Sequence, residues 1–240
     1  MSNLIVALQQ GWTRIGARLL PQACFVCAAN AGAVVLCPEC IRLLPMPPQE
    51  ACPVCAIDSP GAAVCGRCLT RPPRFDATHA AFPYAFPVRE LVHAFKFQAR
   101  FGTGRFLASR LVGLASGIQA DCVVAAPLHP QRLASRGFNQ SILLARPVAK
   151  ALRVPLLRDA VSKARLVPPQ AGLALEERRR NLRGVFVTRR RFDGERVLVV
   201  DDVMTSGTTL DELAGALKAA GAARVEAVVV ARTPRHASPG

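Results

Sequence analysis

The sequence predicts an α/β protein whose parallel sheet is covered by helices on both faces, preceded by a small cysteine-rich module. In the second half of the chain, strand-like runs that are apolar on both faces alternate with helical patterns. This alternation is typical of strands buried inside a parallel sheet. Between residues 22 and 74, Cys, Pro and Gly dominate and no apolar periodicity persists. A chain of 240 residues is long enough for one domain with such a satellite.

Residues 1–21 predict an amphipathic helix, because apolar side chains recur there at helical spacing until Pro21 ends the pattern. We expect this helix to pack on its own protein, with docking to a membrane surface or a partner as the alternative. The Pro-rich stretch 71–74 predicts a boundary between a module of residues 22–74 and a domain of residues 75–235.

Four C-x-x-C knuckles lie in the module, and each pair of knuckles is separated by nine residues, which makes an internal repeat. Two knuckles supply the four thiolates of a closed structural zinc site, so the module is predicted to be a double zinc ribbon with two Zn²⁺ ions. Interleaved pairing of the knuckles, iron–sulfur ligation and a redox role are the alternatives. The repeat favours sequential pairing, with Cys24, Cys27, Cys37 and Cys40 on one ion and Cys52, Cys55, Cys65 and Cys68 on the other.

The main domain has helical patterns at 87–98, 104–118, 139–152 and 207–220 and strand-like runs at 121–126, 196–200 and 224–231. No apolar run approaches the ~20 residues of a transmembrane helix. The amino terminus also lacks the features of a secretory signal. We therefore expect a cytoplasmic protein without a transmembrane segment, in which the cysteines stay reduced.

The most informative stretch is DDVMTSGTT, residues 201–209, between a buried strand and a helix. Backbone amides, Thr and Ser hydroxyls and the positive end of the helix can cradle a phosphate group there. Gly207 allows close approach of the backbone, and Asp201 and Asp202 suit the paired hydroxyls of a sugar. A Walker P-loop is excluded because the chain has no G-K-[ST]. The alternative is that the acidic and hydroxyl residues only cap the helix.

The net charge is +15, and residues 146–196 hold 14 Lys or Arg against five Asp or Glu. Such a surface attracts phosphorylated metabolites or nucleic acid. Arg supplies 27 of the 31 basic residues, so compositional drift is the alternative explanation.

DDVMTSGTT resembles the phosphoribosyl-pyrophosphate (PRPP) loop of type I phosphoribosyltransferases. More narrowly, the chain resembles the ComF competence family, through LLPQACFVC, FKFQARFG, APLHPQRLASRGFNQ and PPQAGLALEERRRNLRGVF. The resemblance implies a type I phosphoribosyltransferase-like fold, with Asp201 and Asp202 as catalytic residues and Mg²⁺ bound together with PRPP. The implied PRPP-binding residues are Asp201, Asp202, Val203, Met204, Thr205, Ser206, Gly207, Thr208 and Thr209.

The resemblance also implies a pyrophosphate loop within 127–139, with Leu128, His129, Arg132 and Arg136 beside the diphosphate. A mobile hood at 163–184 would close over the substrate, although ERRRNLR also fits an exposed basic helix. Lys96 fits a phosphate contact or a solvated helix face.

ComF membership implies a role in DNA uptake during natural transformation, with single-stranded DNA and competence-machinery proteins as partners. Two alternatives stay open. One is a metabolic phosphoribosyltransferase with an unknown amide or base acceptor. The other is a non-catalytic adaptor that binds single-stranded DNA.

Overall fold

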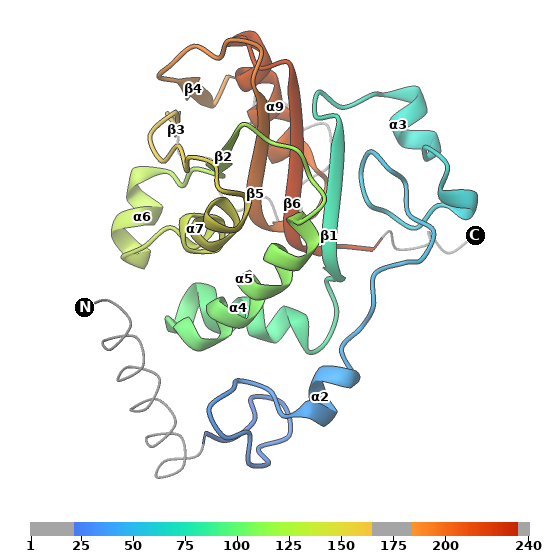
Figure 1. Ribbon diagram of the computed structural model, residues 1–240, viewed down its shortest axis with the longest axis vertical. Coiled ribbons are helices and arrows are strands. Elements are labelled where there is room, and N and C mark those ends of the chain that lie inside the picture. Colours follow the sequence, from blue (N-terminus) through green and yellow to red (C-terminus); the bar gives the residue numbers. More distant parts are fainter. Residues whose placement is uncertain (1–21, 165–183, 235–240) are drawn as a thin grey trace.

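The computed structural model describes residues 22–164 and 184–234 (Figure 1). The amphipathic helix predicted at 1–21 and residues 165–183 of the predicted hood lie outside the described residues. In the described part, no helix is both long and apolar enough to cross a bilayer.

The centre of the fold is a four-stranded, fully parallel sheet in the order β1 (Ala77–Pro83), β6 (Arg224–Arg232), β5 (Arg196–Met204) and β2 (Cys122–Ala125). β5 and β6 lie in the middle and are apolar on both faces, as the sequence predicted. β1 was not predicted. Its sequence, ATHAAFP, shows no regular alternation of apolar and polar residues. As an edge strand, β1 needs less burial than a central strand.

Helices cover both faces of the sheet, which confirms the predicted fold class. On one face, α4 (Val88–Gln98), α5 (Phe101–Ala115) and α7 (Gln140–Leu152) bury a cluster that includes Leu198 and Val200 of β5. On the other face, α9 (Thr208–Ala219) packs against the alternate residues of the same strand. α7 continues through Pro147, a residue expected to kink or begin a helix.

Two smaller elements lie outside the central sheet. α6 (Pro130–Arg136) occupies a stretch that the sequence analysis treated as a loop, although His129 as N-cap, Pro130 and the left-handed Gly137 are the usual signals of a short helix. β3 (Val161–Lys163) and β4 (Phe186–Thr188) form an antiparallel pair.

The cysteine-rich module consists of two loops of the same design, which we call the first ribbon (residues 22–44) and the second ribbon (residues 50–70). Each has an isolated antiparallel bridge, Ala23 with Asn30 and Ala51 with Asp58. In each, the last knuckle begins a one-turn helix, α2 (Pro38–Arg42) or α3 (Gly66–Thr70). A 3₁₀ turn, η1 (Pro60–Ala62), adds to the second ribbon. No regular element was expected here, because single-turn helices carry no periodicity.

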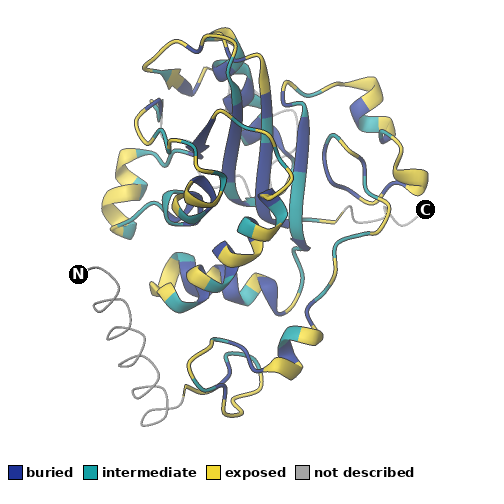
Figure 2. Ribbon diagram, viewed as in Figure 1, coloured by how far each residue is buried: buried dark blue, intermediate teal, exposed yellow. Residues whose placement is uncertain are grey.

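The two ribbons pack against opposite faces of the domain. The first ribbon adds Leu36, Leu44 and three of its cysteines to the apolar cluster of α4, α5 and α7. The second ribbon adds Ile57 and its four cysteines to the cluster under α9. Figure 2 shows the buried central strands between exposed outer helical surfaces.

Candidate functional site

The acidic pair lies at the carboxyl end of β5, where ligands of parallel α/β sheets bind. The Asp201 carboxylate accepts hydrogen bonds from Ser141 Oγ at 3.0 Å and from the Asp202 amide at 2.9 Å. Desolvation of the carboxyl group and the neighbouring Asp202 charge raise the pKa of Asp201 to about 7, against the opposing effect of Lys96. Asp201 therefore changes charge near neutral pH.

Asp202 is buried and pairs with a cation from α4. Its Oδ1 lies 2.7 Å from Lys96 Nζ, and only 6% of the Asp202 side chain and 19% of the Lys96 side chain are exposed. Lys96 is thus no solvated surface lysine. The other oxygen, Asp202 Oδ2, is buried and has no hydrogen-bond partner among the described residues. A buried acceptor of this kind normally has a partner, so it is suited to a ligand hydroxyl or a cation.

Basic side chains surround a cavity of about 430 Å³ next to the acidic pair. Its lining consists of Lys96, Phe97, Ala99, Arg132, Ser135, Arg136 and Phe138. Burial lowers the pKa of Arg136, and burial together with the nearby Arg132 charge lowers the pKa of Lys163. Three cations, Lys96, Arg132 and Arg136, line this cavity, and a cluster of positive charges favours an anionic ligand.

The structure separates the four residues predicted for the pyrophosphate loop. Arg132 and Arg136 line the basic cavity, and Arg136 also donates to Gln140 Oε1 at 2.5 Å. Leu128 lines a different cavity of about 330 Å³. His129 caps α6, because its Nδ1 accepts a hydrogen bond from the Gln131 amide at 3.2 Å. The cis peptide in the described ranges, Phe86–Pro87, is not in this loop.

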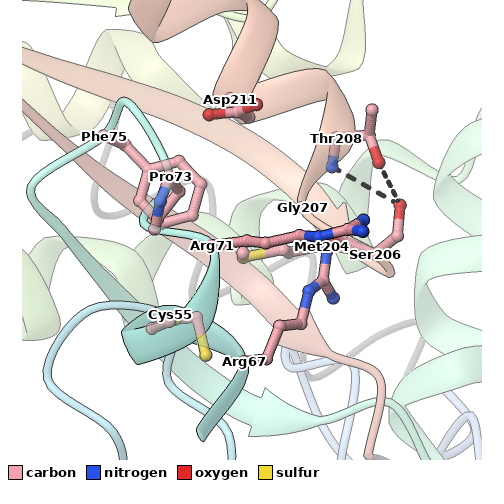
Figure 3. Close-up of a pocket in the computed structure, with 11 residues that line it drawn as sticks. Cys55, Arg67, Arg71, Pro73, Phe75, Met204, Ser206, Gly207, Thr208 and Asp211 are labelled. Carbon is pink, nitrogen blue, oxygen red and sulfur yellow. Dashed lines mark hydrogen bonds between the residues drawn. The ribbon is translucent and has the colours of Figure 1, made fainter. Parts of the chain in front are cut away.

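The predicted phosphate cradle is the turn from β5 into α9. Gly207 has φ +79°, and a Cβ there would lie 2.6 Å from Met204 Cε, so the turn requires glycine. Ser206 Oγ and Thr208 Oγ1 lie 2.8 Å apart (Figure 3). In the part of the chain that the structure describes, the amides of Thr205, Ser206 and Gly207 have no hydrogen-bond partner.

The other residues predicted to bind PRPP lie at the end of β5 or at the start of α9. Met204 is a buried strand residue whose side chain belongs to the cluster under α9. Val203 packs against the opposite cluster. Thr209 lies in the first turn of α9.

Sequence reasoning missed two arginines behind the cradle. Arg67 of the second ribbon donates from Nη2 to the Ser206 carbonyl at 2.7 Å, and Figure 3 shows its side chain reaching toward the turn. Arg232, at the end of β6, donates to carbonyls of the same turn. One signal was available for Arg67, because the repeat places an acidic residue, Glu39, at the corresponding position of the first ribbon.

The eight knuckle cysteines form two separate groups of four, in each of which the sulfur atoms lie within 4.8 Å of one another. The groups are the sequential sets and not the interleaved ones. Cys27 and Cys37 sulfurs lie 3.7 Å apart, as do those of Cys55 and Cys65. Tetrahedral zinc with bonds of about 2.3 Å requires a similar spacing. The donor sets therefore fit two structural zinc ions.

Comparison with known families agrees with this geometry. Residues 139–239 match the phosphoribosyl transferase domain, and residues 15–69 match the double zinc ribbon domain. The fold and site thus define a phosphoribosyltransferase-type domain joined to a double zinc ribbon.

Two bacterial relatives place the chain in a narrower family within this class. The chain is 35% identical over 173 residues to the DNA utilization protein YhgH of Escherichia coli K12. The matched region covers 69% of this chain and 76% of that protein. It is 32% identical over 175 residues to competence protein F of Haemophilus influenzae, with 68% and 76% covered. The chain belongs to this ComF family.

Solved structures with partial similarity include two enzymes. One is described as the allosteric regulatory enzyme of purine biosynthesis, at 25% identity and TM-score 0.37, covering 52% of this chain and 25% of that one. The other is glutamine PRPP amidotransferase from B. subtilis, at 22% identity and TM-score 0.40, covering 57% and 30%.

Proposed function

We propose that the chain binds PRPP at Asp201–Thr209 and takes part in the uptake and use of DNA during natural transformation. The observation that carries the proposal is the convergence of three kinds of group at one sheet edge. Unpartnered amides lie at the cradle, an acidic pair lies beside them, and a basic cavity follows. PRPP has a phosphate, a pair of ribose hydroxyls and a diphosphate in the same order.

In this proposal, each part of the ligand meets groups of complementary chemistry. The 5-phosphate accepts hydrogen bonds from the amides at 205–207 and from the hydroxyls of Thr205, Ser206 and Thr208. The ribose hydroxyls donate to Asp201 and Asp202, whose Oδ2 lacks a partner in the described structure. The diphosphate lies toward Lys96, Arg132 and Arg136.

The oxygen donors of the acidic pair also fit a hard cation, so Asp201 and Asp202 would help to hold Mg²⁺ through the sugar hydroxyls. When bound, Mg²⁺ supplies positive charge that neutralises the diphosphate leaving group. In the proposed complex, the carboxylates would lie near the ribose, where they would stabilise the positive charge that develops at C1 as the diphosphate departs. Phosphoribosyl transfer to an acceptor is the reaction that this arrangement favours.

Support for the DNA role comes from the names of the relatives and from the charge of the chain. A cytoplasmic location suits eight reduced thiolates, and competence-machinery proteins are the proposed partners. The metabolic alternative shares the PRPP site and differs in the acceptor.

Direct binding of single-stranded DNA is a second candidate function, favoured by one specific observation. Phe97 lines the basic cavity and is 64% exposed, and the Arg136 guanidinium lies 5.1 Å from its ring centre. Phe101 is 49% exposed and packs against Phe138, another residue of the lining. Exposed aromatic rings among cations are the groups on which unpaired bases stack.

Calorimetric titration with PRPP and Mg²⁺ tests the proposed site. We expect wild type to bind and Asp202→Asn to weaken binding at least about tenfold, because a charged acceptor of two hydroxyls is worth ~1.5–3 kcal/mol. Asp193→Asn is the matched control, since Asp193 is an exposed acid remote from the site. Absence of wild-type binding, or equal affinity of Asp202→Asn, contradicts the proposal.

The DNA candidate is tested by its salt dependence. Binding of a fluorescent oligonucleotide should weaken steeply as salt rises if arginines neutralise its phosphates. Phe97→Ala should weaken it further at every salt concentration, whereas Phe86→Ala, which removes another exposed ring, should not. A flat salt dependence would rule out phosphate contacts.

A further inference from the structure

The phosphate cradle is held from behind by two arginines that lie outside it. Arg67 Nη2 donates to the Ser206 carbonyl at 2.7 Å. Arg232 Nη1 donates to the Met204 carbonyl at 3.1 Å and also to the Thr205 carbonyl. Three consecutive carbonyl groups of the turn, those of residues 204–206, therefore accept hydrogen bonds from guanidinium groups.

This binding fixes the direction of the amides that follow. In a planar trans peptide, the N–H group points opposite to the carbonyl group of the same peptide unit. The amides of Thr205, Ser206 and Gly207 belong to those three units, so they face away from the arginines. None of them has a hydrogen-bond partner among the described residues. The two arginines thus present a row of donors to the side on which an anion would bind.

Both arginines depend on the second zinc site. Arg67 lies between the ligands Cys65 and Cys68 in the knuckle CGRC. Arg232 is buried, and its Nε donates to the carbonyl of a third ligand, Cys55, at 2.8 Å. Figure 3 shows Cys55 and Arg67 on the ribbon side of the turn, with Gly207 and Ser206 above them. Zinc at this site would hold the knuckles, and the knuckles hold the guanidinium groups.

We infer that the second zinc ribbon is a working part of the phosphate site, with Arg67 as a positioning residue that acts through the Ser206 carbonyl. The inference deepens the proposed function and rests on it for the identity of the ligand. Arg67 does not touch the phosphate in this scheme. It keeps the cradle in the anion-binding conformation before the ligand arrives, which removes an ordering cost from binding.

The first ribbon provides the internal control. Glu39 takes the position of Arg67 in the knuckle CPEC, pairs with Arg42 at the surface, and has a side chain that is 73% exposed. Substitution of Glu39 changes a charge at the same place in the same zinc motif without reaching the cradle.

The test compares Arg67→Gln with Glu39→Gln in the full chain, using ribose 5-phosphate as the probe of the cradle. We expect both variants to retain two zinc ions by metal analysis. Arg67→Gln should lower ribose 5-phosphate affinity about tenfold, as expected for a lost charge-assisted hydrogen bond. In the ligand-free protein it should also speed hydrogen exchange at the amides of 205–207. Arg67→Lys should recover part of both effects, and Glu39→Gln should match wild type.

The two readouts separate this inference from the proposed function. If wild type fails to bind ribose 5-phosphate and PRPP but Arg67→Gln still speeds exchange at 205–207, the proposed ligand is wrong and the positioning role stands. If wild type binds and Arg67→Gln changes neither affinity nor exchange, the positioning role is overturned. Should Arg67→Gln lose zinc, Arg67→Lys decides. With two zinc ions present, unchanged affinity and exchange in that variant overturn the inference, and intermediate values support it.

Discussion

The two ribbons follow one template and differ in what they contact. Each cysteine of the first ribbon has its counterpart 28 positions later, and even the left-handed residues correspond, with Ala28 at φ 60° and Ala56 at φ 55°. The first ribbon meets the domain through apolar side chains and through Phe25, whose ring centre lies 5.5 Å from the Arg100 guanidinium. The second ribbon adds hydrogen bonds to the backbone of the phosphate cradle.

The difference shows how one metal-binding design can serve two purposes. Apolar packing tolerates small shifts in position, so the first ribbon can act as a cover for the surface of α4 and α5. Hydrogen bonds to carbonyl groups are directional, so the second ribbon transmits the geometry of its zinc site to the turn at 205–207. A protein that used both ribbons only as covers would lose stability equally when either one is damaged.

Loss of one zinc ligand is expected to have the largest effect. Cys24→Ser and Cys52→Ser should each leave one zinc ion per chain and each lower the free energy of unfolding by several kcal/mol, because structural zinc contributes on the order of 10 kcal/mol. Only Cys52→Ser should speed hydrogen exchange at 205–207. Metal analysis, urea unfolding and exchange measure these outcomes. Equal exchange at the cradle in both variants would abolish the functional distinction between the ribbons.

The anchors of the ribbons should differ by a smaller but clear margin. Arg232→Met leaves the buried Cys55 carbonyl without its donor, at a cost of about 1–3 kcal/mol for that unsatisfied group. Arg100→Met removes the cation–π contact with Phe25, worth about 0.5–1 kcal/mol at an exposed site. Urea unfolding of the two variants should therefore give clearly unequal losses. Similar losses would mean that both ribbons are anchored mainly by apolar packing.

The raised pKa of Asp201 should make the stability of the protein depend on pH, independently of either ribbon. Its pKa is raised from 3.8 to about 7 by desolvation and by Asp202. Between these values the folded chain holds a proton that the unfolded chain has released, so stability falls as pH rises through this window and stays low above it. Asp201→Asn should remove the dependence and raise the melting temperature at pH 8 by a few degrees, while PRPP binding is lost.

The control for this prediction is Asp193→Asn, which removes an exposed acid and should leave the pH profile of stability unchanged. Asp201→Asn should stabilise the Cys24→Ser and Cys52→Ser chains by the same amount, since the residue bonds to neither ribbon. A melting temperature for Asp201→Asn that is equal to or below that of wild type at pH 8 would show that the charged Asp201 carboxylate does not destabilise the free protein.

Alanine substitutions at two glycines, Gly207 and Gly102, should give the smallest difference in stability. Gly207→Ala places a residue with a Cβ at φ +79° and should cost about 1 kcal/mol or more. Gly102→Ala places a Cβ 3.2 Å from a methyl group of Val35 in the first ribbon, and its helical backbone accepts alanine. Thermal unfolding should show a loss for Gly207→Ala and almost none for Gly102→Ala. The reverse order would place the tighter packing at the first ribbon.

Sequence patterns predicted the helices and strands whose apolar periodicity reflects burial in the core. They missed the elements that carry little apolar periodicity. The Val-rich runs of β5 and β6 are central strands, and α4, α5, α7 and α9 begin and end close to the expected positions. β1 and α6 were missed because an edge strand and a two-turn helix need little apolar patterning. The sequential cysteine groups were predicted correctly, since a repeat of local motifs requires no knowledge of tertiary contacts.

The same distinction applies to the candidate site. DDVMTSGTT could be found because its groups are contiguous. Arg67 and Arg232 come from positions 139 and 27 residues away from the turn residues they contact. The repeat marks Arg67 as different from Glu39, but no sequence pattern connects either arginine to the turn that it contacts. His129, which the resemblance places beside the diphosphate, is also the N-cap of α6, a role that the sequence analysis did not assign to it.

The strand order β1-β6-β5-β2 has a consequence for synthesis on the ribosome. Of the four strands of this sheet, β6 is made last, yet it pairs with β1 on one side and β5 on the other. Until it emerges, β1 and the second ribbon attached to it have no sheet partner, although the four cysteines of that ribbon are already available to zinc. The second ribbon, stabilised by its metal ion, would then already be folded when Arg232 is made. Pairing of β6 would complete the sheet and the cradle in one step.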